Sequence, residues 1–172
     1  MDYTFHYDSP LGGITIASDG EALVGLWFDG QKHFAEVLQR QNTTADFPVF
    51  QETCRWLDIY FSGNDPGFIP KLCVRATPFR KEVCRILLTI PFGKTMTYGE
   101  IATQIAATRG AGKMSAQAVG GAVGHNPISI IIPCHRVVGA GGSLTGYAGG
   151  ITKKYQLLLM EKSGISPDNY YR

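Results

Sequence analysis

The pattern of apolar residues changes once along this chain, and the change limits which folds the sequence can adopt. Residues 3–30 hold short β-prone runs separated by "SPLGG" and "SDGEA". Turn-forming residues between short runs predict a three-stranded antiparallel meander. From residue 48 the apolar residues recur at helical spacing instead, in "PVFQETCRWLDIYFSG", which predicts a helix that stops at Gly63. The expected fold class is therefore α+β.

The same change of pattern predicts two domains. The segment "SGNDPG", at residues 62–67, has the composition of a linker. We expect residues 1–70 to form a small α+β domain with an antiparallel sheet and one helix. We expect residues 71–172 to form a mostly helical domain.

Capping residues predict three helices early in the second half. Thr77 is a plausible N-cap with Pro78 in the first helical position of "TPFRKEVCRILLTI". Thr97 and Glu100 match the capping box and begin "TYGEIATQIAA". Ser115 can cap "SAQAVGGAVGHN". The second and third helices then form either a helix-turn-helix or an ordinary helical hairpin.

Two further elements are predicted near the C-terminus. The run "ISIII", at residues 128–132, is short and β-branched, which favours a buried strand that ends at Pro133. The run "ITKKYQLLLMEKSG" predicts a last helix that ends at Gly164. Its inward-facing residues are expected to be Leu157, Leu158 and Met160.

Charge is distributed unevenly although the net charge is only +2. Residues 1–70 hold three Lys or Arg against ten Asp or Glu, whereas residues 71–172 hold thirteen against four, a balance of +9. A basic second half favours contact with a polyanion, with nucleic acid as the leading candidate. An accidental bias among solvated surfaces is the alternative.

Membrane, secretory and metal classes find no support in the sequence. No apolar run approaches the roughly 20 residues of a membrane span, and "MDYTFHYDSPLGG" lacks the features of a signal peptide. The expected location is the cytoplasm, or the nucleoid or nucleus if the nucleic-acid partner is DNA that lies there. The four cysteines show no metal-ligand spacing, so neither a metal site nor a disulfide is expected, and Cys54, Cys73 and Cys84 are interpreted as core residues.

The third predicted helix has a face made of small residues: Ala116, Ala118, Gly120, Gly121, Ala122 and Gly124. Because glycine costs about 1 kcal/mol in a helix interior, so many of them need a reason. Either another backbone segment packs closely on this face, or a ligand such as a nucleic-acid groove approaches it.

Cys134 and His135 are adjacent in "ISIIIPCHRVVG". A thiol reacts as the thiolate, so a nearby base must help, and His135 is the nearest one in sequence. Adjacent side chains rarely face each other, so this pair needs a turn or an intervening water. A purely structural role for the Cys134 thiol is the alternative.

Four motifs together resemble the O6-alkylguanine-DNA alkyltransferase family, whose members are also called methylated-DNA–protein-cysteine methyltransferases. They are "TPFRKEVCRILLTIPFGKTMTYGEIA" (77–102), "AVGGAVGHNP" (118–127), "IPCHRVVG" (132–139) and "LTGYAGG" followed by "KKYQLLLMEK" (144–162). The resemblance implies DNA repair by direct damage reversal, with double-stranded DNA containing O6-alkylguanine as partner. It also implies a monomer that needs no cofactor.

The resemblance implies roles for individual residues. Cys134 would attack the alkyl carbon and keep the group as a thioether, so that one chain performs one repair. His135 would take the thiol proton through a water, and Glu161 would orient His135. Asn126 would brace the site.

Other positions of the motifs would bind the damaged base. Tyr98 would donate toward the purine and help to turn the nucleotide out, and Tyr147 would lie against the extruded base. Val137 and neighbouring backbone would read the guanine edge, and the N–H of Ala148 or Gly149 would reach O6. Some relatives have serine at position 148, so one hydroxyl contact is absent here.

The family extrudes the base from the minor groove, and the small face with Ser115, Ala118 and Gly121 would lie against DNA. Many relatives have an arginine before AVG that fills the space left by the base, whereas this chain has Gln117. Gln117 would fill part of that space, with Lys113 or Arg109 as candidate helpers. Arg136 is expected to be structural.

Two other functions remain as alternatives. One is an alkyltransferase-like protein that recognises damage without repairing it, although those relatives replace the acceptor cysteine, which this chain retains. The other is a Cys/His hydrolase unrelated to DNA. That function explains neither the uneven charge nor the small-faced helix.

Overall fold

The N-terminal strands form the predicted meander in a computed structural model that describes residues 1–39, 41–43 and 46–169. Strands β1 (Asp2–Ser9), β2 (Gly12–Ser18) and β3 (Leu23–Phe28) pair antiparallel in that order. A short strand, β4 (Gln41–Thr43), pairs parallel to β1 and was not predicted. The described sheet therefore has the order β3-β2-β1-β4, and it is mixed because β4 pairs parallel to β1 while the other described pairs are antiparallel.

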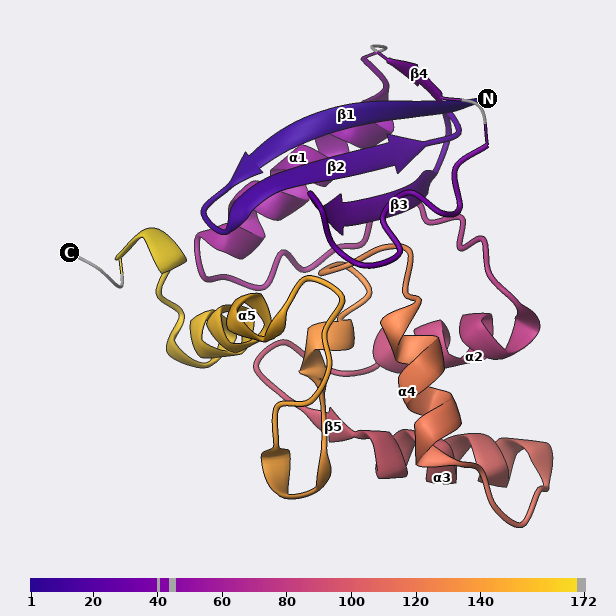
Figure 1. Cartoon of the computed structure of the whole chain (residues 1–172). Coiled ribbons are helices and arrows are strands. Elements are labelled where there is room, and N and C mark those ends of the chain that lie inside the picture. The colour runs from indigo at the N-terminus through magenta and orange to yellow at the C-terminus, as the bar shows by residue number, and fades with distance from the viewer. Residues whose placement is uncertain (40, 44–45, 170–172) are drawn as a thin grey trace.

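Helix α1 (Pro48–Phe61) covers one face of this sheet, as Figure 1 shows. The predicted helix is confirmed, and the chain leaves it through Gly63 with φ of +90°. A Cβ atom on Gly63 would lie 2.4 Å from the carbonyl oxygen of Gly164. Only glycine fits there, because the segment after α1 presses against the end of the last helix.

The three predicted caps in the second half are confirmed. Helices α2 (Pro78–Leu87), α3 (Tyr98–Arg109) and α4 (Ala116–Gly124) begin after Thr77, Thr97 and Ser115, and each cap side chain accepts a backbone N–H of the first turn. The capping box is complete, since Glu100 also accepts from the N–H of Thr97. Helices α3 and α4 pack against each other across residues 110–115 and form the predicted helix-turn-helix.

The strand predicted over residues 128–132 is wrong. These residues are buried as expected, but they form a turn in which the N–H of Ile132 donates to the carbonyl of Ile128. Asn126 closes the turn, because its Oδ1 accepts from the N–H of Ile128 and its Nδ2 donates to Ile132. Ile130 adopts φ of +68°, which is strained for a β-branched residue. A continuous apolar run indicates that the segment is buried but does not determine that it forms a strand.

The last helix, α5 (Ile151–Ser163), is confirmed and ends at Gly164 in a left-handed conformation. Leu157 and Met160 are buried, whereas Leu158 is only half-buried, contrary to expectation. The inward face also carries two charged residues, Lys154 and Glu161. Remaining elements are β5 (Met96–Thr97), which pairs parallel with β6 (Val137–Val138), and the 3-10 turns η1 (Cys134–Arg136), η2 (Ala140–Gly142) and η3 (Pro167–Asn169).

One apolar cluster joins the two halves of the chain. It includes sheet residues such as Leu26, residues of α1 and residues of α2 to α5. Beyond residue 70 the chain still touches the sheet, because the N–H of Leu23 donates to the carbonyl of Lys71. Whether residues 1–70 and 71–172 are separate domains stays a prediction. Of the cysteines expected in the core, Cys84 is buried and Cys54 and Cys73 are half-buried.

Among the described helices, none combines the length and apolar character that crossing a membrane requires.

Candidate active site

Cys134 lies at a pocket beneath α4 and beside the loop that precedes α5. It opens the 3-10 turn η1, directly after the buried turn at residues 127–133, and is only 5% exposed. The expectation that a strand would deliver it is therefore wrong. The pocket is lined by Lys32, His33, Tyr98, Gly120, Val123, Gly124, Cys134, Gly146, Tyr147 and Ala148. Successive side chains of a 3-10 turn point roughly 120° apart, so Cys134 and His135 project in different directions.

The Cys134 thiol is held in its protonated form. Burial raises its pKa, and the amide of Asn126 and the charge of Lys154 offset this only in part. A buried thiol of raised pKa is a poor nucleophile by itself. Transfer chemistry at this sulfur therefore requires a base within reach.

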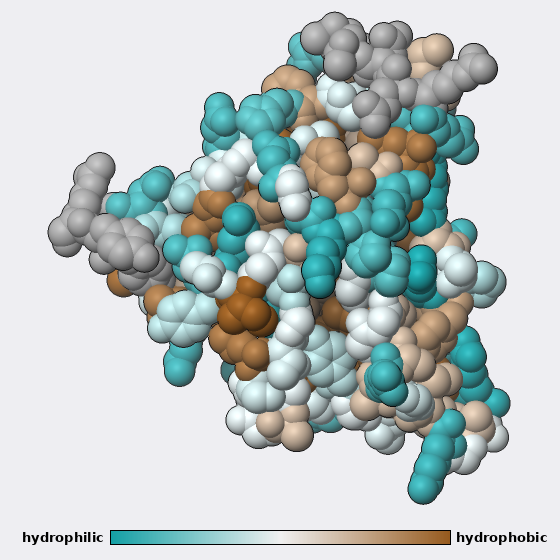
Figure 2. Space-filling view, viewed as in Figure 1, coloured by the Kyte–Doolittle hydropathy of each residue, from teal (hydrophilic) through white to brown (hydrophobic). Residues whose placement is uncertain are grey.

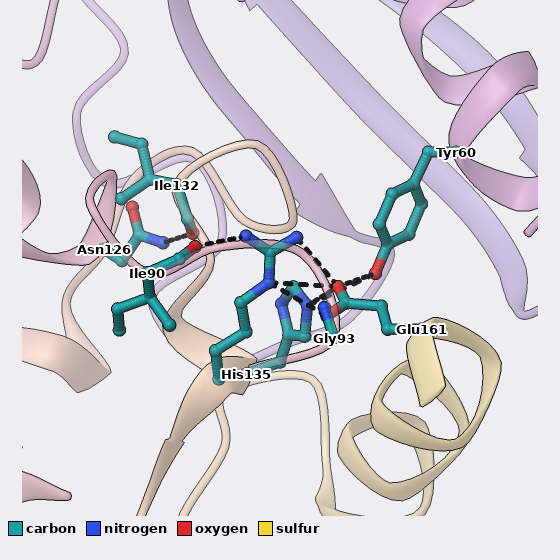
Figure 3. Close-up of polar contacts among 8 residues, drawn as sticks. Tyr60, Ile90, Gly93, Asn126, Ile132, His135 and Glu161 are labelled. Atoms are coloured by element: carbon teal, nitrogen blue, oxygen red, sulfur yellow. Dashed lines mark hydrogen bonds and ion pairs between the residues drawn. The ribbon is translucent and has the colours of Figure 1, made fainter. Parts of the chain in front are cut away.

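His135 is a buried imidazole with one bound nitrogen and one free nitrogen. Its Nε2 lies 2.5 Å from Oε1 of Glu161, as Figure 3 shows. Because an ionised carboxylate only accepts, Nε2 carries the proton and Nδ1 holds the lone pair. This Nδ1 has no hydrogen-bond partner among the described residues. Burial lowers the pKa of His135, so the imidazole is neutral and can accept a proton at Nδ1.

Glu161 is the carboxylate that fixes this imidazole. Burial alone would raise its pKa, but His135 and the guanidinium of Arg136 hold the pKa well below its usual range. Arg136 donates from Nε to Oε2 at 2.9 Å and from Nη2 to Oε1 at 3.0 Å. Its Nη1 donates to the carbonyl of Ile90, and the N–H of Gly93 reaches Glu161 at 3.1 Å. Arg136 is thus structural, as expected.

Tyr60 of α1 completes this buried cluster. Its hydroxyl donates to Oε1 of Glu161 at 2.7 Å and lies 3.2 Å from Nε2 of His135. Burial and the neighbouring carboxylate raise the pKa of Tyr60 well above its ordinary value, so the phenol stays neutral. A residue of the first half of the chain therefore contacts both His135 and Glu161 of the second half.

Two tyrosines form the walls of the pocket. Tyr98 begins α3, and its hydroxyl donates to the carbonyl of Thr145 at 3.0 Å. The hydroxyl of Tyr147 is buried and has no hydrogen-bond partner among the described residues. Gly149 lies between rings, since a Cβ there would be 2.9 Å from Tyr147 and 3.1 Å from Phe28. The loop before α5 is therefore closely packed where it borders the pocket.

Buried Lys154 ties this loop to η1 and β6. Its Nζ donates to the carbonyls of Val137, Thr145 and Gly146 at 2.5 to 3.2 Å. Val137, three residues after Cys134, is fully buried. The carbonyl of Ala148 accepts from the N–H of Lys32. Three accepting carbonyls satisfy the ammonium group, although burial lowers its pKa.

Comparison with known proteins identifies the relatives of this chain. Residues 78–163 match the family model "6-O-methylguanine DNA methyltransferase, DNA binding domain", and residues 2–68 match "6-O-methylguanine DNA methyltransferase, ribonuclease-like domain". A curated methylated-DNA–protein-cysteine methyltransferase of Mycobacterium bovis is 46% identical over 166 residues, which cover 95% of this chain and 96% of that protein. The chain belongs to the 6-O-methylguanine DNA methyltransferase family.

Solved structures of this methyltransferase family show the same fold. The crystal structure of Mycobacterium tuberculosis OGT in complex with DNA has a TM-score of 0.81 and 45% identity, and the match covers 97% of this chain and 96% of that one. An O6-methylguanine DNA methyltransferase from Methanococcus jannaschii has a TM-score of 0.62 and 26% identity, with 93% of each chain covered.

Part of the small-residue set of α4 is open in this methyltransferase family member, whereas Ala122 is buried in the core. Ser115, Gln117, Ala118 and Gly121 are exposed, and in Figure 2 the region of α4 shows white and tan residues with teal ones among them. Added Cβ atoms at Gly121 or Gly124 would meet nothing within 4 Å, and at Gly120 only the ring of Tyr98. Packing by another backbone segment is therefore not the reason for these glycines.

A groove beside this face leads to the pocket of Cys134. It is lined by Thr97, Tyr98, Gly99, Ala116, Gln117, Gly120, Gly139, Ala140, Thr145 and Gly146. Tyr98, Gly120 and Gly146 line both the groove and the pocket. A chain that occupies the groove can therefore place one substituent in the pocket.

The two candidate helpers differ, and only Lys113 lies in the loop between α3 and α4, because Arg109 is the last residue of α3. Arg109 forms an ion pair with Glu82 at 2.6 Å and lies over the ring of Phe79, so it is held away from the groove. Lys113 is exposed beside Met114 and Ala116. Sequence reasoning missed Tyr60, one of the apolar residues at helical spacing in "PVFQETCRWLDIYFSG", and Lys154, for which the sequence offered no signal.

Proposed function

We propose that this protein repairs O6-alkylguanine in DNA by irreversible transfer of the alkyl group to Sγ of Cys134. One observation carries the proposal: Cys134 lines a pocket while its neighbour His135 has Nε2 bound to Glu161 and a buried, unpartnered Nδ1. This is the arrangement that a thiol needs when its base acts through a water.

The transfer step balances without any further reactant. The thiol proton passes through a water to Nδ1 of His135, sulfur bonds to the alkyl carbon, and the bond from that carbon to O6 breaks. The electron pair stays on the guanine, which takes up one proton at N1. Glu161 stabilises the imidazolium that forms transiently. Because a thioether does not return the alkyl group, each chain acts once.

The pocket walls supply the contacts for the purine. Tyr98 exchanges its bond to Thr145 for one to the base, and Tyr147 offers a hydroxyl that has no described protein partner. The backbone at Val137 reads the guanine edge, and the N–H of Ala148 or Gly149 reaches O6. Asn126 keeps the turn before Cys134 closed.

Double-stranded DNA is the proposed partner, and a monomer is the proposed active form. The lesion base leaves the stack by flipping, because its O6 atom lies inside the duplex. The exposed face with Ser115, Ala118 and Gly121 approaches the minor groove, where backbone contacts position the protein without reading sequence. Support comes from the basic balance of residues 71–172 and from the relative solved in complex with DNA. Gln117 fills the space left by the base, with Lys113 as the helper, because Lys113 is exposed whereas Arg109 is paired with Glu82.

Intact-protein mass spectrometry tests this function. After incubation with a duplex containing one O6-methylguanine, the protein should gain the mass of one methyl group in place of a hydrogen, on the peptide that carries Cys134. Cys134→Ala should gain none and still bind the duplex. Cys73→Ala, which changes a half-buried thiol of a different apolar cluster, should react like the wild type. An unchanged wild-type mass with retained binding would identify a damage-recognition protein instead.

A further inference from the structure

A group of metal-binding side chains lies at the rim of the same pocket. One ligand atom from each of His33, Glu36 and His125 lies within 4.8 Å of the other two. His33 and Glu36 belong to the segment after β3, whereas His125 follows the last residue of α4. The two imidazole rings are in contact, with centroids 3.8 Å apart.

Each of the two histidines can offer one ring nitrogen to an ion. Nδ1 of His125 lies 2.7 Å from the carbonyl of Gly121. Because a carbonyl only accepts, Nδ1 carries the proton and Nε2 holds the lone pair. Histidines that bind metals commonly donate their other N–H to a carbonyl in this way. Nδ1 of His33 lies 2.8 Å from the carboxylate of Glu36, so an ion bound by both residues takes the place of the proton between them.

The backbone around His33 has an unusual conformation. His33 and Ala35 both adopt φ of +58°, a conformation that is uncommon for residues other than glycine and that clusters at functional sites. The N–H of Lys32 is bonded to the carbonyl of Ala148 across the pocket. This hydrogen bond to the loop before α5 therefore holds the segment that carries His33 at the rim of the pocket.

We propose that His33, Glu36 and His125 bind one divalent transition-metal ion of the Zn²⁺ class. Two imidazoles and one carboxylate are a donor set that zinc accepts with a fourth position open. Tetrahedral zinc spaces its ligand atoms about 3.4 Å apart, so small side-chain rotations close the site. The bound ion links the segment after β3 to the end of α4.

The location gives the ion a consequence that rests on the proposed function. His33 lines the pocket of Cys134, which receives the extruded base. An ion that fixes His33 to His125 restricts the side of the pocket that His33 lines, so it slows alkyl transfer. The ion thereby acts on access to the pocket rather than on the thiol.

Metal binding is tested without DNA. The tag-free full chain is titrated with Co²⁺, and one equivalent should produce visible d–d absorption without a thiolate charge-transfer band. His33→Ala and His125→Ala should each weaken binding by about tenfold or more, since even the loss of an outer-shell partner costs that much. Glu36→Gln should also weaken it. His6→Ala, which removes an exposed histidine paired with Asp8, should change nothing.

Two results would overturn the site. One is equal Co²⁺ affinity in His33→Ala, His125→Ala and the wild type. The other is a charge-transfer band that disappears in Cys134→Ala, which would assign the ion to the thiol. Neither result depends on repair activity, so the metal site and the proposed function fail separately.

The effect on access is measured by the rate of methyl transfer from duplex DNA with and without Zn²⁺. Zinc should slow the wild type several-fold and leave His125→Ala unaffected. Equal slowing of both proteins would mean that zinc acts on Cys134 directly, and the rim mechanism would be wrong.

Discussion

The hydroxyl of Tyr60, on α1, donates a hydrogen bond of 2.7 Å to Oε1 of Glu161, on α5, across 101 positions of sequence. Figure 3 shows the phenol approaching the carboxylate from the side opposite the turn that holds Asn126. The same oxygen accepts from Nε2 of His135. The helix of the first half of the chain thus helps to hold the imidazole that we propose as the base.

Removing this hydroxyl should slow transfer without weakening DNA binding. We expect Tyr60→Phe to lose about 1.5–3 kcal/mol of stability, because the bond is made to a charged group. The rate of methyl transfer should fall, since His135 and Glu161 lose a shared partner. Single-turnover kinetics on the methylated duplex measure the rate, and a binding isotherm measures the affinity. The matched control is Tyr7→Phe, which removes a 2.7 Å bond to Asp58 outside the pocket lining. Equal rates in both variants would contradict a positioning effect of Tyr60.

Breaking the buried pair of Arg136 and Glu161 should destabilise the fold strongly. Arg136→Met leaves the carboxylate buried without its guanidinium, a change that costs about 3–5 kcal/mol. Urea unfolding of the wild type and the variant measures the difference. Arg109→Met is the control, because it removes a more exposed pair with Glu82, which is worth about 1 kcal/mol or less. Similar losses in the two variants would mean that burial does not set the strength of the Arg136 pair.

The ion pair of Asp2 and Arg75 should make the stability of the fold depend on pH in the acid range. Arg75 donates to both carboxylate oxygens, at 2.6 and 2.8 Å, and its hydrogen bond is the main cause that lowers the pKa of Asp2. A carboxyl whose folded pKa is depressed stabilises the fold above its unfolded value, near 3.8, and this stability is lost as pH falls through the folded pKa.

Urea unfolding of the wild type and Asp2→Asn across this pH range checks the prediction. The wild type should be the more stable protein at neutral pH, and the difference between the two should shrink as pH falls below about 4. Other carboxyl groups are common to both proteins and cancel in the difference. A gap that stays constant down to the lowest pH would exclude a contribution from Asp2 ionisation.

Restoring an arginine at position 117 should speed repair in duplex DNA. Gln117 is exposed and lines the groove beside α4. A longer, charged side chain would fill more of the space left by a flipped base. Gln117→Arg should therefore accelerate transfer from a duplex more than from a single strand, which has no stack to reopen. Equal acceleration on both substrates would remove the space-filling explanation. Gln104→Arg, which adds the same charge on α3, controls for charge alone.

The sequence by itself determined the features that depend on near neighbours. Thr77, Thr97 and Ser115 each begin a helix because a cap bonds to backbone two or three residues away. The meander between residues 2 and 28 formed for the same reason, since its turns are local. The motif around Cys134 pointed to the family, which the comparisons then showed.

Only the tertiary structure decided how distant residues meet. The run at residues 128–132 has no periodicity, so its turn depends on bonds from Asn126 and on pairing with Leu26. Tyr60 and Lys154 contact the site because helices far apart in sequence pack on one core. The metal site joins His33 to His125 across 92 positions, which no ligand spacing in the sequence could reveal. Neighbouring residues determine local hydrogen bonds, whereas contacts between distant residues form only after the chain has buried its apolar surface.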